Sequence, residues 1–549
     1  MKIIAAITAD FERTFLGRRS RLNDELLGET VLRRTVKRVL AAKRLASVHL
    51  LVDKSQEEQA RQTVAGLAVR VETHQAGGVP WESYVASARK WSLDAWRGGL
   101  AGTCVFDESV HPWLLEALAR REQAEGVVDV PAAAVLLDPV LLDAMVEHYE
   151  KVYADVRMTF TQAAPGLSAA IYAPALLADL MKANQPPGRM MAYQPALPQR
   201  DLIMLPCFYP PEVEVRRACG RCVADTDAAM ERITAILARA GGSADDPFTP
   251  DVLTVSRFLL ERWGVRADPL PGEVEIELTT EDPLATTTIR PRGEILGRRG
   301  PMADSVFDRL IEELARRDDV RVVLGGFGDS LHHPSWQRCV RKCREAGVFG
   351  LAVRTTAARL DDAAIQTLVE ARVDVLNVLI DAATREKYLG VHNVDLYEQV
   401  VANVERLLAV QTERQQPQPI VVCELTKTTT TMEEMESFYD RWVSRVGTAV
   451  ISGPSSYAGQ WPDLSVMDMA PPKRVACERL FSRAMVLADG RVPVCDQDFK
   501  GLRTVGSVTE SSFAALWSGQ WMVEIREGHA AGRFDAMSLC PGCREWHRP

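Results

Sequence analysis

The sequence predicts an α/β protein built from several domains, and three observations support this. The chain has 549 residues, which is too long for a single hydrophobic core. Short apolar runs alternate with helical patterns along residues 1–190 and again from residue 273. The last stretch, 471–549, has short strand patterns with glycine and cysteine. It is too small to build much of a core alone, and a bound metal would explain why it folds.

Composition narrows the class of protein. With 47% hydrophobic and 25% charged residues, the chain has the content of an ordinary soluble protein. A net charge of −9 without a lysine-rich block argues against nucleic acid and against an anionic membrane surface as partners. The apolar run Ile3 to Ala9 is soon interrupted by Asp10 and Glu12, so it predicts a buried strand rather than a signal peptide. No stretch reaches the roughly 20 apolar residues that span a bilayer. We therefore expect a cytoplasmic protein.

Residues 1–190 predict a parallel sheet with helices on both faces, because apolar runs such as KIIAAIT and SVHLLVD alternate with helical patterns such as ETVLRRTVKRVLAAKR. Residues 191–272 are rich in proline and glycine, with one helix expected at Ala228–Ala240. This composition predicts a linker or an inter-domain packing segment.

Residues 273–470 predict a full or partial (β/α) barrel. Apolar runs are each followed by a helical pattern, and hairpin signals are missing; the runs are VEIELTT, VRVVLGG, FGLAVRTT, DVLNVLID and PIVVCELT. Cys339 and Cys343 lie four residues apart on one expected helix, which favours burial against the barrel over a metal site.

Four cysteines of the segment 471–549 predict a metal site. Cys477 and Cys495 precede the pair Cys540 and Cys543, which sits on one turn and can share a metal without strain. Eleven cysteines in a chain of cytosolic character are more readily metal ligands or buried thiols than disulfides. On spacing alone, Zn²⁺ and a 4Fe–4S cluster suit four thiolates equally well.

Further motifs surround these cysteines: V-x-x-D-G before Cys495, then G-S-V, F-x-x-L-W, H-x-x-G-R and finally L-C-x-x-C-x-E-W. Together they resemble the SPASM domain, which lies at the C-terminus of many radical-SAM enzymes. The resemblance implies that Cys477, Cys495, Cys540 and Cys543 hold an auxiliary 4Fe–4S cluster, with zinc as the alternative.

The segments VEIELTT, GGFGDSLHHP, VRTTAARL, DVLNVLIDAATREKY and YEQVVANVERL lie in residues 273–456. They resemble the radical-SAM core, in which a C-x-x-x-C-x-x-C loop after the first strand binds a cluster that leaves one iron for S-adenosylmethionine. Here the loop reads TTEDPLATTTIRP and has Asp282, Thr286 and Ile289 at the cysteine positions. Aspartate can ligate iron, threonine does so poorly, and isoleucine cannot. The sequence therefore predicts no 5′-deoxyadenosyl radical from this site.

Three interpretations of the barrel remain open. The first is a pseudoenzyme, kept as a scaffold or binding surface. The second is a loop that still binds S-adenosylmethionine or a related nucleotide through backbone groups. Those groups would belong to Gly325, Gly326 and Gly328. In the third, Cys219 and Cys222, with Cys207, supply a displaced cluster.

Residues 1–190 are similar to nucleotidyltransferases of the sugar-phosphate and cytidylyltransferase kind, through RSRLNDELLGETVLRRTVKRVL, VVDVPAAAVLLDPVLLDAMVEHY and FTQAAPGLSAAIYAPALL. The resemblance implies a Rossmann-like domain. Its first turn has Gly17 alone where that family has a glycine-rich turn around the triphosphate. Arg18, Arg19 and Arg21 are the candidates for neutralising phosphate, and a solvated basic loop is the alternative.

The Mg²⁺-binding aspartate of that family is uncertain here. Ala133 stands at its expected position, which leaves Asp107, Glu108 and Asp138 as candidates. The pair Asp138-Pro139 instead favours the start of a helix.

The chain thus has a nucleotidyltransferase-like region, then a radical-SAM-like barrel and then a SPASM-like region. This order of domains resembles a bacterial family called spiro-SPASM proteins. We expect an iron–sulfur protein of the radical-SAM/SPASM superfamily that has lost its SAM-cluster cysteines and serves as a non-radical binding, electron-transfer or scaffold protein. Its ligand would be a peptide, a protein or a nucleotide. The alternatives are a nucleotidyltransferase acting on a sugar or alcohol phosphate, and a radical-SAM enzyme with atypical cluster ligands.

Overall fold

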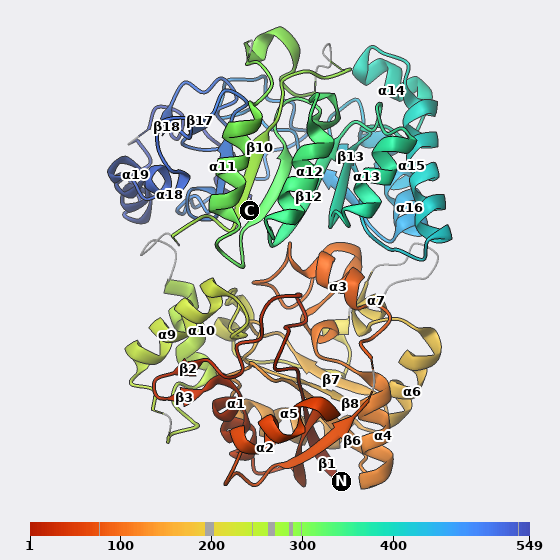
Figure 1. Cartoon of the computed structure of the whole chain (residues 1–549), viewed down its shortest axis with the longest axis vertical. Helices are drawn as coiled ribbons and strands as arrows, with labels where there is room; N and C mark the ends of the chain where they lie inside the picture. The colour runs from red at the N-terminus through yellow and green to blue at the C-terminus, as the bar shows by residue number, and fades with distance from the viewer. Residues whose placement is uncertain are drawn as a thin grey trace. The chain divides into compact units, whose positions relative to one another are not determined.

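A computed structural model describes the whole chain except residues 76, 193–201, 244, 262–268, 285–288, 298, 536 and 549. The chain divides into two compact units, Met1–Glu261 and Arg262–Pro549, which are coloured red to yellow-green and green to blue in Figure 1. Among the described residues, no helix combines the length and apolar character needed to cross a membrane. The predicted α/β class is confirmed, because each unit is built on a largely parallel sheet with helices packed against it.

The N-terminal unit contains a seven-stranded sheet in the order β5-β4-β1-β6-β8-β7-β9. Its strands are β1 (Ile3–Ala9), β4 (Ser47–Asp53), β5 (Arg70–His74), β6 (Gly126–Pro131), β7 (Met158–Thr161), β8 (Ala170–Tyr172) and β9 (Phe208–Tyr209). β1, β4, β5 and β6 are parallel as predicted, whereas β8 runs antiparallel to β6 and β7. The connection from β7 to β8 is too short for a crossover helix, so these two strands pair antiparallel.

Helices cover both faces of this sheet, as predicted. Ile3, Ala5 and Ile7 of β1 belong to one apolar core, whereas Ile4 and Ala6 belong to a second. The first core includes α1 (Val31–Leu40) and α5 (Pro139–Val152), and the second includes α4 (Pro112–Glu122) and α6 (Pro174–Ala183). Smaller elements complete this part: β2 (Glu25–Leu26), β3 (Glu29–Thr30), α2 (Glu57–Thr63), α3 (Glu82–Arg89) and α7 (Pro187–Met191).

The described part of the segment 191–261 packs on the N-terminal unit. Its helices are α8 (Val213–Arg217), α9 (Asp227–Ala240) and α10 (Val252–Glu261). The helix expected at Ala228–Ala240 is α9, which begins after Thr226 because the Thr226 hydroxyl accepts from the Ala229 amide. Apolar residues of all three helices join the first core, so the segment contributes structure as well as connection.

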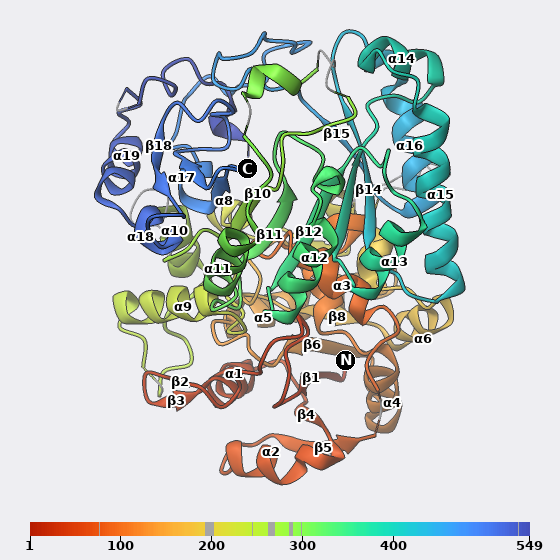
Figure 2. The ribbon, with the colours of Figure 1, turned by 45° about the horizontal axis from the view of Figure 1, so that its top comes forward.

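The C-terminal unit contains a second seven-stranded sheet, in the order β15-β14-β13-β12-β11-β10-β16, and every neighbouring pair is parallel. Its first six strands are β10 (Glu273–Glu277), β11 (Arg321–Gly325), β12 (Gly350–Thr355), β13 (Val375–Leu379), β14 (Ile420–Thr426) and β15 (Ala449–Ser452). The connecting helices are α11 (Asp304–Leu314), α12 (Trp336–Glu345), α13 (Asp362–Glu370), α14 (Arg385–His392), α15 (Tyr397–Glu413) and α16 (Met435–Val446). The predicted βα repeat is therefore present, and the strand order ends at two unpaired edges, as in a partial barrel (Figures 1 and 2).

The last segment adds a strand to this sheet. β16 (Arg483–Val486) pairs with β10, and β17 (Arg491–Pro493) forms an antiparallel ladder with β18 (Thr504–Ser507). The helices here are α17 (Arg479–Ser482), α18 (Phe513–Trp517) and α19 (Gln520–Ala530). Val486, Phe513 and Ile525 belong to the same core as the barrel residues, so this small segment shares the core of a larger body.

Short 3₁₀ turns complete the two units. They are η1 (Lys54–Gln56), η2 (Leu100–Gly102), η3 (Val105–Glu108), η4 (Leu202–Met204), η5 (Gly293–Leu296), η6 (Ser330–His332), η7 (Met432–Glu434) and η8 (Glu545–His547).

Candidate metal centre

The four C-terminal cysteines line one cavity. Cys477 precedes α17, Cys495 follows β17, and Cys540 and Cys543 lie beyond α19. The cavity is otherwise lined by Ala458, Arg474, Arg479, Leu480, Gln497, His529, Met537, Leu539, Glu545 and Trp546. The fold thus brings together three segments that are up to 66 residues apart in sequence, as the distance from Cys477 to Cys543 shows.

Local turns fix the backbone at these positions. The Cys543 amide donates to the Cys540 carbonyl at 3.1 Å, and the Glu545 amide donates to Cys543 Sγ at 3.3 Å. The Asp498 amide donates to the Cys495 carbonyl at 3.2 Å. Cys495, Cys540 and Cys543 therefore sit on turns whose backbone is held by hydrogen bonds within the protein.

The thiols are held in a largely desolvated environment. Burial raises the pKa of Cys477 to about 12 and the pKa of Cys540 to about 11. Burial also raises the pKa of Cys495 well above its usual value and that of Cys543 more moderately. Left to themselves these groups stay protonated at neutral pH, so a metal that binds them must displace the protons.

The spacing of the thiols is wider than a single metal ion requires. We asked which three metal-ligating atoms lie within 4.8 Å of one another. Among the described residues, one such group exists in the N-terminal unit, and no three of the four cysteine Sγ atoms meet this limit. A tetrahedral zinc with Zn–S bonds of about 2.3 Å places its sulfur ligands roughly 3.8 Å apart. In every set of three of these cysteines, at least one pair of Sγ atoms is therefore farther apart than 4.8 Å.

His529 on α19 also lines the cavity. Its ring is 2% exposed, and its Nδ1 accepts a hydrogen bond from the Cys477 amide at 3.4 Å. Burial, followed by the charge of Arg474, lowers the pKa of His529 to about 4. The H-x-x-G-R pattern contained this residue, but sequence reasoning assigned it no role, because only the fold places it beside Cys477.

Comparison with known proteins decides the class of this region. Residues 477–544 match the SPASM family, described as an iron-sulfur cluster-binding domain. The chain contains a SPASM domain. The prediction of a SPASM domain at the C-terminal end of an α/β chain is thereby confirmed.

Two proteins and one solved structure are similar to parts of this chain. An uncharacterized protein of Treponema pallidum (strain Nichols) is 25% identical over 251 residues, which cover 43% of this chain and 68% of that protein. A GTP 3′,8-cyclase of Chlorobaculum tepidum is 35% identical over 82 residues, 15% of this chain and 25% of the cyclase. The crystal structure of Streptococcus suis SuiB bound to precursor peptide SuiA is 10% identical, with 52% of this chain and 73% of that chain covered and a TM-score of 0.40.

The loop after β10 carries an ion pair in place of thiolates. The Asp282 carboxylate accepts from the Leu284 amide at 2.7 Å and pairs with Arg292, and both side chains of this pair are 2% exposed. Ile289 is buried at 4% exposure, and Thr286 lies outside the described residues. Asp282 and Ile289, which the sequence comparison placed at motif positions, therefore have structural roles in the loop.

Charges at the neighbouring strand ends are also paired. Arg290 donates to Asp381 at 2.9 Å and to the Thr426 hydroxyl at 3.1 Å, and Asp381 is fully buried. Arg290 is the charge that holds the pKa of Asp381 below its usual range, against the opposing effect of burial. This side of the barrel is thus occupied by matched charges.

The glycines after β11 allow close packing of the chain. Gly326 has a φ of +88°, its amide donates to Glu275 at 2.7 Å, and an added Cβ would lie 2.6 Å from the Glu277 Cβ. An added Cβ at Gly328 would lie 2.2 Å from the Thr279 carbonyl oxygen, and Gly325 ends β11. Gly326 and Gly328 therefore pack against β10 and the loop that follows it, and Gly325 packs between Glu275 of β10 and Arg354 of β12.

The N-terminal unit has a second candidate site, a cavity of about 490 Å³ at the carboxyl ends of β1, β4, β5 and β6. β4 and β6 lie on opposite sides of β1, and parallel sheets bind ligands at such a switch point. The charged lining residues are Asp10, Glu12, Arg13, Arg21, Asp53, Glu82, Glu108, Arg221 and Asp225. Among the described lining residues, acidic groups outnumber basic ones, which disfavours a bare triphosphate.

The predicted phosphate-binding arginines are already engaged. Arg21 lines the cavity and pairs with Asp227 at 2.5 Å. Arg19 pairs with Asp24 at 2.7 Å, and the Arg18 amide donates to the Thr14 hydroxyl. Neither Arg18 nor Arg19 is among the described lining residues.

The acidic candidates have different surroundings. Glu108 lines the cavity and pairs with Arg89 at 2.6 Å and with Arg221 at 2.7 Å. Asp107 is fully buried, and burial raises its pKa to about 6. Asp138 caps α5 by accepting from two backbone amides, as its sequence predicted.

The other predicted cysteines are distributed over both units. Cys222 and Cys207 are buried and Cys219 is exposed, and all three belong to the N-terminal unit. Cys339 and Cys343 are both fully buried on α12, which confirms the expected packing against the barrel.

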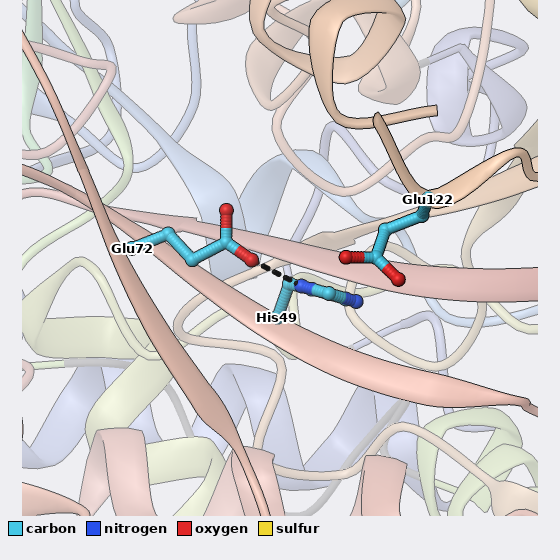
Figure 3. Close-up of side chains that lie close together, drawn as sticks. All are labelled: His49, Glu72 and Glu122. Atoms are coloured by element: carbon cyan, nitrogen blue, oxygen red, sulfur yellow. Dashed lines mark hydrogen bonds and ion pairs between the residues drawn. The ribbon is translucent and has the colours of Figure 1, made fainter. Parts of the chain in front are cut away.

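The group that meets the 4.8 Å limit is His49, Glu72 and Glu122. His49 Nδ1 contacts Glu72 at 2.5 Å, as Figure 3 shows, and its Nε2 contacts the Ser47 hydroxyl at 2.7 Å. Arg121 pairs with Glu72, and Lys2 and Arg70 pair with Glu122 at 3.3 and 3.2 Å. Both ring nitrogens and both carboxylates therefore already have protein partners.

Proposed function

We propose that this chain is a non-radical iron–sulfur protein whose SPASM domain holds one 4Fe–4S cluster through Cys477, Cys495, Cys540 and Cys543. The cluster serves a structural or electron-transfer role, and the barrel is a scaffold or binding surface for a peptide, protein or nucleotide. The observation that carries the proposal is the convergence of these four thiols on one cavity within a region that matches a cluster-binding family.

The match to a cluster-binding family favours a cluster over zinc. Thiolates around a 4Fe–4S cube bind at separate irons and lie farther apart than the ligands of one zinc ion. No three of the four Sγ atoms lie within 4.8 Å of one another, which is compatible with ligands on separate irons. A bound 4Fe–4S cluster supplies one-electron redox chemistry, and the protein sets its potential through burial and hydrogen bonds.

The barrel loop supports the non-radical part of the proposal. Asp282 is committed to Arg292 and to the Leu284 amide, and the Ile289 side chain is apolar. Freeing Asp282 to ligate iron would leave a buried guanidinium unpaired, a loss of about 3–5 kcal/mol. The loop is therefore poorly suited to the open-cornered cluster that S-adenosylmethionine needs.

Iron and sulfide counting on anaerobically purified protein tests the proposal. We expect about four irons per chain, lost in Cys540→Ala and retained in the matched control Cys339→Ala, whose thiol is buried elsewhere in the same unit. About eight irons would contradict the non-radical assignment, and zinc in place of iron under strictly anoxic conditions would contradict the cluster. Reduced samples given S-adenosylmethionine should form no 5′-deoxyadenosine, and its formation would support the atypical-ligand alternative.

The cavity at the switch point of the N-terminal unit favours a second candidate activity, nucleotidyl transfer to a sugar or alcohol phosphate. Its volume suits a small ligand, and its carboxylates offer oxygen ligands to Mg²⁺ that would offset a triphosphate. Labelled CTP, UTP and GTP with Mg²⁺ test this candidate. Nucleotide binding that is lost in Asp53→Asn would support nucleotidyl transfer as an activity of this cavity. Absence of binding at millimolar nucleotide would exclude it.

A further inference from the structure

His529 is a buried polar side chain with one ring nitrogen engaged and the other without a partner. Nδ1 accepts from the Cys477 amide, whereas Nε2 is fully buried and has no hydrogen-bond partner among the described residues. Buried polar groups in folded proteins almost always have a partner, and leaving one unpaired costs about 1–3 kcal/mol. Because His529 lines the cysteine cavity, the group that occupies this cavity is the natural partner.

The tautomer of the ring follows from its known contact. An imidazole nitrogen that accepts a hydrogen bond has a free lone pair, so the proton of a neutral ring is on the other nitrogen. With Nδ1 accepting from a backbone N–H, the Nε2 of His529 must be the N–H donor. The edge of Phe534, with ring centroids 5.2 Å apart, restrains the orientation of the ring.

His529 lines the cavity together with the four cysteines, so sulfur acceptors come near its buried donor when the cavity is filled. We propose that the Nε2–H of His529 donates a hydrogen bond to a sulfur atom of the bound cluster, either a bridging sulfide or a cysteine Sγ. This inference rests on the cluster proposed above. His529 is a positioning residue here and not a ligand, because four cysteines already supply one thiolate to each iron of a cube.

The hydrogen bond has a consequence for electron transfer. Reduction adds negative charge to the cluster, and an N–H donor aimed at sulfur stabilises that charge more than it stabilises the oxidised form. His529 therefore raises the reduction potential. The same ring joins the cluster to the Cys477 backbone, so it also restrains the first cysteine of the SPASM domain.

Potentiometric titration of the reconstituted full-length protein, followed by the EPR signal of the reduced cluster, tests the inference. We compare the native chain with His529→Leu, which fills similar space without a donor, and with His529→Gln, whose amide can donate to sulfur. At a fixed potential near the midpoint, the ratio of reduced to oxidised cluster should fall three- to tenfold in His529→Leu, a negative shift of up to about 59 mV. His529→Gln should recover most of the native potential.

Each outcome separates this inference from the cluster proposal. Native protein without iron overturns both. Four irons with the same potential in the native chain and His529→Leu overturn only the role of His529. The role of His529 is also overturned if the EPR signal of the reduced cluster shows a coupling to ¹⁵N-labelled histidine as large as that of an iron ligand. If His529→Leu loses iron, His529→Gln decides: retention of iron at a near-native potential supports the hydrogen bond, and loss of iron overturns it.

Discussion

Arg299 joins the barrel to the SPASM domain, and its replacement is the sharpest test of how the C-terminal unit is held together. Its guanidinium donates to both oxygens of Glu277, at 2.7 and 2.9 Å, and both side chains are nearly inaccessible. It also donates to the carbonyls of Leu296 at 2.8 Å and Phe499 at 3.0 Å. Glu277 in turn accepts from the Ala488 amide at 3.1 Å.

The expected cost follows from leaving Glu277 charged and buried. Removing one partner of a buried ion pair typically costs about 3–5 kcal/mol, so Arg299→Met should lower the free energy of unfolding of this unit by that amount. Replacing Glu277 by methionine as well removes the stranded charge, and we expect the double variant to be more stable than Arg299→Met by at least about 1 kcal/mol. Arg338→Ala is the matched control, because Arg338 pairs with Asp308 at the surface, where such pairs contribute at most about 1 kcal/mol.

Urea unfolding of metal-free protein, followed by tryptophan fluorescence, measures these differences. With an m value of about 3 kcal/mol/M, a loss of 3 kcal/mol moves the midpoint by about 1 M. Metal-free samples separate packing from any stabilisation by a bound cluster. A midpoint for Arg299→Met that moves no more than that of Arg338→Ala would refute the reasoning, because the pair would then contribute no more than a surface contact.

Three further predictions follow from buried groups. Cys339→Ala should cost about 1–2 kcal/mol in urea unfolding through lost packing, with no change in iron content. Burial raises the pKa of Asp129, which accepts from Ser109 at 2.7 Å, to about 7. The folded chain thus holds an extra proton between roughly pH 4 and 7 and loses stability as pH rises through that window. Asparagine does not titrate, so the stability of Asp129→Asn should not fall in this way. Between pH 5 and pH 8, the free energy of unfolding of Asp129→Asn should therefore rise relative to that of the native chain by about 2–3 kcal/mol. Gly326→Ala should lower the free energy of unfolding by more than about 2 kcal/mol, because the added Cβ would overlap Glu277. If this variant instead keeps its stability and loses nucleotide binding, the backbone at this position binds a ligand.

Local sequence patterns predicted the elements well where neighbours along the chain determine them. The run Ile3 to Ala9 is β1, and the helix expected at Ala228–Ala240 is α9. The antiparallel β8 and the pairing of β16 with β10 were not predicted. β16 and β10 are separated by about 200 residues, and the short apolar run of β16 carries no sign of which strand it will join.

The residues of the candidate site also fall into those that local sequence patterns predicted and those that depend on packing. Cysteine spacing and the surrounding motifs predicted the four residues that the fold gathers on one cavity. They could not predict His529, because the contact of its ring with the Cys477 amide depends on how α19 packs. They also gave no role to Arg290 and Arg292, because the partners Asp381 and Asp282 become neighbours of these arginines only in the folded chain.

The strand ends of the barrel and the SPASM cavity differ in how their charged groups are paired, and this difference supports the proposal that a metal binds in the cavity and not at the barrel. At the barrel, Asp381 and Glu277 already have guanidinium partners, so an incoming iron or sulfonium would have to break a buried pair at about 3–5 kcal/mol. In the SPASM cavity, the thiols hold protons that iron can displace, and the backbone turns keep their positions when it does. If the barrel binds no cluster, as we propose, its internal ion pairs still preserve the sheet that supports β16, and through β16 the placement of Cys477 and Cys495. Under this proposal the barrel serves the SPASM domain as a rigid support.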